Sequence, residues 1–145
     1  MDGINSIKNN LRSSVFVCGF IFLFSINSAA QKIAVLVPEK NKQSQDFAER
    51  LETSLGEKFK ILDTSMSETA FRSVKFENPF NLYKTEAKLI GAVIGCDYFL
   101  LVKSQTLRRA SLSKPDYFES YAVIYVVSSR SGRLIFWKLA SFEAG

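Results

Sequence analysis

Five consecutive apolar residues, Ile33 to Val37, constrain the fold of this chain more than any other segment. Pro38 ends the run, and a short continuous apolar segment with such an end is typical of a central strand buried on both faces. A helical pattern follows, with Ser44 as its expected amino-terminal cap. Its apolar residues recur at steps of three and four: Phe47, Ala48, Leu51 and Leu55. A second strand is predicted from Phe59 to Asp63, so the chain opens with a βαβ unit whose two strands run parallel.

Two more helices are expected before residue 95. Ser65 and Glu68 have the spacing of a capping box and introduce a short helix, which ends before Asn78-Pro79. Another helix is predicted from Lys84 to Ile94, with Gly95 as its left-handed terminator. Glycine weakens a helix interior, so Gly91 predicts a close packing contact in the middle of that helix.

The last third of the chain is predicted to consist of strands. The first runs from Tyr98 to Val102 and is followed by a polar link. A long strand from Tyr117 to Val127, a turn over residues 128–132 and a returning strand from Arg133 to Leu139 complete the chain. The predicted fold is therefore an α/β (α+β) domain in the order β-α-β-α-α-β-β-β, with helices packed on a five-stranded mixed sheet.

The first 30 residues have the three parts of a secretory signal peptide. Lys8 and Arg12 precede an apolar run from Val15 to Ile26, and small residues (Ser-Ala-Ala) follow. The run of about 12 residues is shorter than the roughly 20 that a helix needs to cross a bilayer. We therefore predict cleavage after Ala30, a single domain over residues 31–145, and a periplasmic or secreted location. The alternative is an uncleaved leader that anchors the protein to a membrane by its amino end.

The composition argues against catalysis and against a bound metal or cofactor. The chain contains no histidine, which excludes Ser-His-Asp and Cys-His arrangements and any zinc site with a histidine ligand. Without the leader, Cys96 is the only cysteine, and its apolar surroundings predict a small buried side chain. The net charge of +5 is spread among acidic residues, so no nucleic-acid partner is expected. The remaining enzymatic alternative is a small periplasmic hydrolase with a serine–lysine dyad at Ser111 and Lys114.

Three segments resemble, in this order, the amino-terminal domain of TolB and its relatives, among them the curli-secretion lipoprotein and the lipoprotein activators of penicillin-binding proteins. They are an opening strand at Lys32–Pro38, a helix end and strand at Ile94–Leu101, and a hairpin turn at Ser128–Trp137. Asp97 is placed to accept backbone amides at a strand entrance, whereas Ser128 replaces the family's aspartate. Similar domains stand at the amino end of longer TonB-like envelope proteins. The resemblance implies a domain that binds other proteins or envelope components and does no chemistry.

A basic and aromatic patch is expected in the polar link and at the start of the next strand. Its members are Arg108, Arg109, Lys114, Tyr117 and Phe118. Such a patch can engage anionic lipid headgroups, a glycan or an acidic face of another envelope protein.

The final hairpin shows almost no alternation of apolar and polar residues over Tyr121–Val127 and Leu134–Leu139. Both of its faces therefore need cover, and we favour burial by the helices predicted earlier. The alternative is an edge strand, with Arg133 and Trp137 as binding residues, that accepts a strand from a partner or a second copy.

Taken together, these features predict an exported, non-enzymatic binding or assembly module of the bacterial cell envelope, without cofactor or metal. The finer interpretation is the amino-terminal part of a TolB-like or TonB-like transport-associated protein. Two alternatives stay open besides: the small hydrolase, and a truncated structural fragment of a longer envelope protein.

Overall fold

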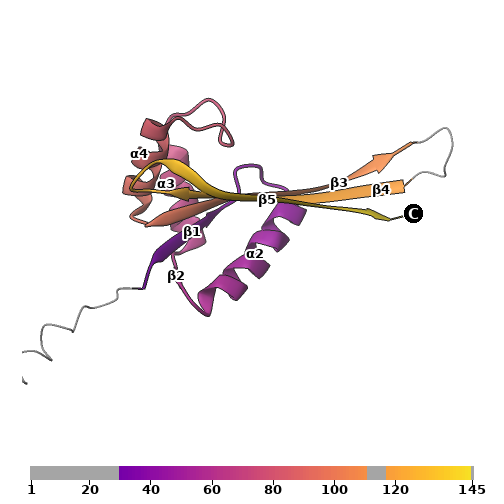
Figure 1. Cartoon of the computed structure of the whole chain (residues 1–145), viewed down its shortest axis with the longest axis horizontal. Coiled ribbons are helices and arrows are strands. Elements are labelled where there is room, and N and C mark those ends of the chain that lie inside the picture. The colour runs from indigo at the N-terminus through magenta and orange to yellow at the C-terminus, as the bar shows by residue number, and fades with distance from the viewer. Residues whose placement is uncertain (1–29, 111–116, 145) are drawn as a thin grey trace, which may run out of the picture.

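The computed structural model describes residues 30–110 and 117–144 of the 145-residue chain, which form one sheet flanked by helices (Figure 1). The sheet has five strands in the order β2-β1-β3-β4-β5. Their bounds are β1 Lys32–Leu36, β2 Lys60–Ile61, β3 Tyr98–Arg109, β4 Tyr117–Ser128 and β5 Arg133–Ala144. β1 pairs in parallel with β2 and β3, whereas β3, β4 and β5 pair antiparallel. The predicted mixed sheet and element order are confirmed.

Helices cover both faces of the inner part of the sheet. α2 (Lys42–Gly56) packs on one face, and α3 (Thr64–Ser73) and α4 (Lys84–Ile94) pack on the other (Figure 1). Ile33 and Val35 of β1 belong to the core under α2, while Ala34 and Leu36 belong to the core under α3 and α4. Successive side chains of a strand point to opposite faces, which explains why β1 is apolar from Ile33 onward. The prediction of a central strand buried on both faces is confirmed.

Two predicted helix caps are wrong. α2 is capped by Asn41, whose Oδ1 accepts the backbone N–H of Ser44 at 2.8 Å, so Ser44 lies inside the helix. α3 is capped by Asp63, whose carboxylate accepts the Met66 N–H at 2.8 Å, and not by a Ser65–Glu68 box. Asn and Asp cap as well as Ser, and the charge of Asp suits the positive end of the helix.

Gly95 adopts the expected left-handed conformation, and Gly132 also has a positive φ. Gly95 ends α4 with φ 76°, and Gly132 closes the β4–β5 turn with φ 66°. The close contact expected at Gly91 is also present, because a Cβ atom on this residue would lie 2.3 Å from the Cβ atom of Ser129.

The outer parts of β3 and β5 extend further than predicted. β3 continues through the segment predicted as a polar link, because every residue to Arg109 pairs with β4. β5 likewise continues past Leu139 to Ala144. These parts project beyond the helices (Figure 1). Among the helices formed by the described residues, none is long and apolar enough to span a membrane; the predicted leader lies outside those residues, apart from Ala30.

Candidate binding surface

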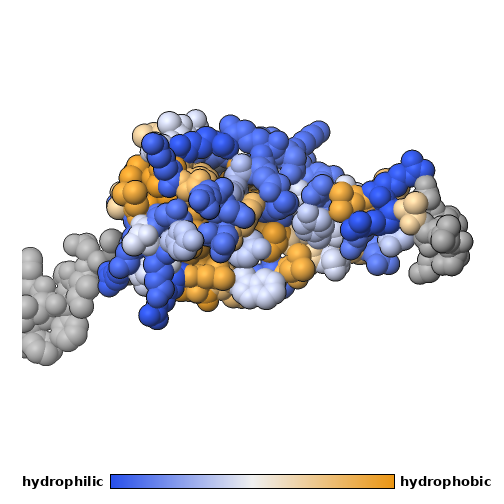
Figure 2. All heavy atoms as spheres, turned by 90° about the horizontal axis from the view of Figure 1, so that it is seen from above, coloured by the Kyte–Doolittle hydropathy of each residue, from blue (hydrophilic) through white to orange (hydrophobic). Residues whose placement is uncertain are grey.

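β5 forms an edge of the sheet and leaves large apolar side chains uncovered. Its exposed apolar side chains are Leu134, Ile135, Phe136, Trp137, Leu139 and Phe142, with exposed fractions from 50% to 69%. Figure 2 shows uncovered apolar (orange) groups beside charged (blue) ones. The expected burial of the final hairpin by helices is wrong for β5. α2 and α3 pack mainly on β1 and β3, and α4 packs mainly on β4.

On the face that carries α3 and α4, β5 borders an aromatic groove. Trp137 lies opposite Tyr125 and Leu139 lies opposite Val123, and directly opposite residues share one face of a sheet. With Phe80, Tyr121 and Lys103 these side chains enclose a groove of about 340 Å³. We call this set of seven residues the aromatic groove.

Aromatic, cation–π and ionic contacts order the side chains of the aromatic groove. The ring centroids of Phe80 and Tyr125 lie 5.7 Å apart, and the Lys103 ammonium lies 5.7 Å from the Phe80 centroid. Lys103 Nζ also lies 2.8 Å from the Glu39 carboxylate, and this hydrogen bond raises the pKa of Lys103. Because Glu39 neutralises the ammonium, the groove offers aromatic surface rather than net charge.

On the opposite face of the sheet, which carries α2, β5 is also apolar. Phe136 lies opposite Val126, and Phe142 lies opposite Ser120. The pairing of β4 with β5 shifts register between Val126 and Val127, and it is regular from Phe136 onward. β5 therefore presents one apolar side chain after another to solvent, on both faces.

The described members of the predicted basic and aromatic patch lie on strands and not in a loop, and they are divided between the two faces of the sheet. Arg108 pairs with Phe118 and Arg109 pairs with Tyr117, at the outer ends of β3 and β4. The Arg109 Nε donates to Glu119 at 2.8 Å, which raises the pKa of Arg109. Lys114, Ser111 and the rest of residues 111–116 lie outside the described residues.

Arg133 and Trp137 do not join that patch. Arg133 starts β5 opposite Ser128, at the other end of β4 from Tyr117. The distance along β4 is roughly 35 Å at about 3.3 Å per residue. Sequence reasoning thus found Trp137 but missed the groove around it. The unbroken apolar run of β4 indicated that both faces of the final hairpin need cover. No sequence pattern, however, pairs Trp137 with Tyr125 or Phe80.

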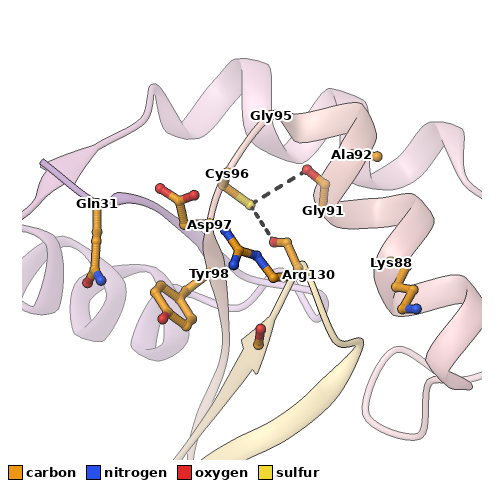
Figure 3. Close-up of a pocket in the computed structure, with 11 residues that line it drawn as sticks. Gln31, Lys88, Gly91, Ala92, Gly95, Cys96, Asp97, Tyr98 and Arg130 are labelled. Carbon is orange, nitrogen blue, oxygen red and sulfur yellow. Dashed lines mark hydrogen bonds between the residues drawn. The ribbon is translucent and has the colours of Figure 1, made fainter. Parts of the chain in front are cut away.

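A second hollow, of about 690 Å³, lies where the amino ends of β1 and β3 meet the end of α4 (Figure 3). Lys88, Arg130 and Cys96 are among its lining residues. The Asp97 carboxylate in this hollow is engaged in a hydrogen bond within the fold. It accepts the Lys32 N–H at 2.8 Å, as the sequence predicted.

Cys96 in this hollow has the features of an inert thiol. Its partners are the Gly91 carbonyl at 4.0 Å and the Ser129 hydroxyl at 3.4 Å, and neither is a base that accepts its proton. Burial raises the pKa of the thiol, so the nucleophilic thiolate is disfavoured. The prediction of a small buried side chain is confirmed. Within residues 30–110 and 117–144, no three His, Cys, Asp or Glu side chains gather as a metal site.

No protein-family model and no curated protein matches the sequence, but solved structures share the fold. The chain is similar to the crystal structure of lipoprotein GNA1162 from Neisseria meningitidis, with a TM-score of 0.57 and 16% identity over 79% of this chain and 83% of that one. It is less similar to the hypothetical protein CT253 from Chlamydia trachomatis (TM-score 0.49, 12% identity, 79% and 73% covered) and to the LpoB C-terminal domain from Salmonella enterica (0.48, 12%, 86% and 90%). The likeness shows that this chain shares its fold with a lipoprotein. The finer resemblance to TolB, the curli-secretion lipoprotein and TonB-like proteins stays a prediction.

Proposed function

We propose that this chain is an exported, non-enzymatic binding and assembly module of a bacterial cell envelope. The observation that carries the proposal is the uncovered edge strand β5, with its six exposed large apolar side chains. Soluble proteins rarely leave contiguous apolar patches of more than a few hundred Å² exposed unless a partner covers them. A partner that covers β5 removes this surface from water.

The proposed location rests on the leader and on the domain that follows it. Residues 1–30 direct export, and residues 31–145 form the binding module. The shared fold with a lipoprotein supports an envelope location. A leader that is kept as an anchor leaves the same module outside the cytoplasm, at a membrane surface.

The aromatic groove is the proposed anchor point for a protein partner. Trp137 is 59% exposed, and tryptophan and tyrosine dominate the energetic centres of protein interfaces. The groove holds its cation in an ion pair with Glu39, which weakens its attraction for an anionic lipid headgroup. A protein surface with apolar side chains therefore fits the groove better than a lipid surface.

The outer end of the sheet provides a second proposed contact. Arg108 and Phe118 lie there on one face and Arg109 and Tyr117 on the other, and Phe118 is exposed. The ion pair between Arg109 and Glu119 reduces the net positive charge of this cluster. We propose that the outer end of the sheet extends the interface with an envelope protein. An anionic lipid headgroup and a glycan are the other ligands that the arginine and aromatic side chains there can bind.

A non-enzymatic role agrees with the chemistry of the described residues. The chain has no histidine, and the buried Cys96 keeps its proton because burial raises the pKa of the thiol. The finer proposal, a TolB-like or TonB-like transport-associated protein, rests on the three sequence segments that resemble that family.

Substitution of Trp137 tests the proposal. The Trp137→Ser variant and the unchanged protein are used to capture partners from envelope extracts, and mass spectrometry quantifies what each retains. Truncation of a central aromatic residue costs roughly 2 kcal/mol of binding free energy, which corresponds to about a thirtyfold weaker capture.

Tyr83→Ser is the matched control, because Tyr83 is also an exposed aromatic residue (72%) but lies before α4. It is expected to leave capture unchanged, and melting temperatures show that both variants fold. Equal capture by Trp137→Ser and the unchanged protein would refute the proposed binding surface.

A further inference from the structure

Among the described residues, β5 lacks the devices that protect the other free edges of the sheet. β2 forms the opposite edge and has only two residues. β3 is paired with β1 only as far as Leu101, and side chains of α2 cover part of the edge beyond that point. Ser44 Oγ accepts the Ser104 N–H at 2.9 Å and donates to the Ser104 carbonyl at 3.0 Å, and Gln43 Oε1 accepts the Thr106 N–H at 2.8 Å.

Such protection is the usual way in which proteins prevent sheet edges from pairing with other chains. Short edge strands and covered edges are two of the common devices, and prolines and inward-pointing charges are others. β5 has twelve residues, no proline and one lysine in its middle. Its irregular pairing with β4 affects only its first residues. Two edges of this sheet are thus protected, and the longest is open.

The sequence of β5 is complementary to itself when two copies run antiparallel. A two-fold axis at Leu139 places Phe136 of each copy opposite Phe142 of the other and Lys138 opposite Ala140. Phe136 and Phe142 lie on the same face of the sheet, and aromatic pairs across neighbouring strands are stabilising. An axis one residue earlier would place Lys138 opposite Lys138, and like charges in direct opposition are destabilising.

We infer that the occupant of the β5 edge is a second copy of this chain, paired antiparallel about a two-fold axis at Leu139. The dimer has one continuous sheet of ten strands, and the interface uses the same surface patch of each subunit, as a two-fold dimer requires. Main-chain hydrogen bonds between the edges provide binding free energy, and the pairing of Phe136 with Phe142 favours this register. The inference rests on the proposed function, because it names a partner for the same strand.

The oligomeric state of the purified full chain is the direct test, by light scattering after size-exclusion chromatography at several concentrations. The unchanged protein is expected to be a dimer. Leu139→Lys places two ammonium groups at the two-fold axis, and the dissociation constant of the dimer is expected to rise at least about tenfold. Leu89→Lys is the matched control, since Leu89 is equally exposed (53% against 54%) but lies on α4, and this variant is expected to stay dimeric.

Cross-linking tests the register without introducing a charge. Directly opposite residues of an antiparallel pair have Cβ atoms about 4.5–5.5 Å apart, close to the separation that a disulfide spans. Leu139→Cys is therefore expected to give a covalent dimer on mild oxidation, whereas Leu89→Cys and the unchanged chain give none. Phe136→Cys and Phe142→Cys are expected to cross-link with each other when mixed.

Three results would overturn the inference: a monomer at every concentration, a dimer that Leu139→Lys leaves intact, or cross-linking that does not depend on position 139. If a monomeric chain still captures envelope proteins through Trp137, the occupant is another protein and the proposed function stands. If the purified chain dimerises in this register but captures nothing, the dimer stands and the proposed binding of other envelope proteins fails.

Discussion

Gly91 fixes the relation between α4 and the turn that leads into β5. A Cβ atom on this residue would lie 2.3 Å from the Ser129 Cβ and 2.9 Å from the Ser129 Cα. The backbone of the turn therefore rests directly on the helix, and Cys96 fills the adjacent space with its thiol against Ser129. The sequence predicted a close contact at Gly91 because glycine weakens a helix interior, but it did not identify the segment in contact.

Gly91→Ala is expected to destabilise the protein by about 1–3 kcal/mol, because the added methyl group has no space and the turn must shift. Gly56→Ala is the matched control, since Gly56 is also helical and its Cβ would meet only Ile61 Cγ1 at 3.9 Å. At that position alanine is expected to be neutral or to stabilise by about 0.4–1 kcal/mol. Urea denaturation measures both free energies of unfolding, and equal values would contradict the close contact.

The amino end of α2 has a structural role that its helical pattern does not reveal. Ser44 is buried, and its hydroxyl replaces a neighbouring strand for the backbone of Ser104 on β3. The sequence suggested Ser44 as a helix cap because Ser is a common capping residue. Asn41 takes that role, and Ser44 is thereby available to β3, sixty residues away along the chain.

Ser44→Ala is expected to cost about 1 kcal/mol of stability, because it leaves the partly buried N–H and carbonyl of Ser104 without this partner. Ser54→Ala is the control, because Ser54 lies on the exposed side of the same helix. Chemical denaturation gives both values, and hydrogen exchange of the Ser104 amide reports the local effect. Unchanged stability in Ser44→Ala would show that water replaces the hydroxyl.

Strands were predictable where helices cover them and much less so elsewhere. β1 and the inner half of β3 are apolar because both faces are buried. From Lys103 outward, β3 projects beyond the helices and carries mostly polar residues. Without a buried face there is no apolar pattern to detect, and the strand exists because β4 pairs with it residue by residue. Pairing between distant segments is not encoded in local sequence.

The whole molecule has a layered end and an open end. Helices cover β1 and the inner halves of β3 and β4 near the amino terminus of the domain, and the uncovered sheet projects in the opposite direction (Figure 1). The fold class and the presence of Trp137 in the candidate surface could be predicted from the sequence. The aromatic groove and the open edge could not, because they depend on which strand ends the sheet and on how far the helices reach.

The layered end begins directly after the predicted cleavage site. Ile33 is the first residue of the core, and Gln31 is exposed, with its carbonyl accepting the Lys60 N–H at 3.1 Å. The core formed by the described residues therefore lies entirely after the predicted cut. We expect the protein recovered from the envelope fraction to begin at Gln31, with the intact mass of residues 31–145.

Two neighbouring substitutions test this expectation. Signal peptides need small residues at the position before the cut and two positions earlier, here Ala30 and Ser28, but not between them. Ala30→Leu is expected to block trimming, and Ala29→Leu is expected to leave it intact, as read from intact masses in fractionated cells. Full-length protein in the cytosol, or equal trimming of both variants, would contradict export with cleavage after Ala30. A full-length chain held in the membrane fraction would instead identify the leader as an anchor.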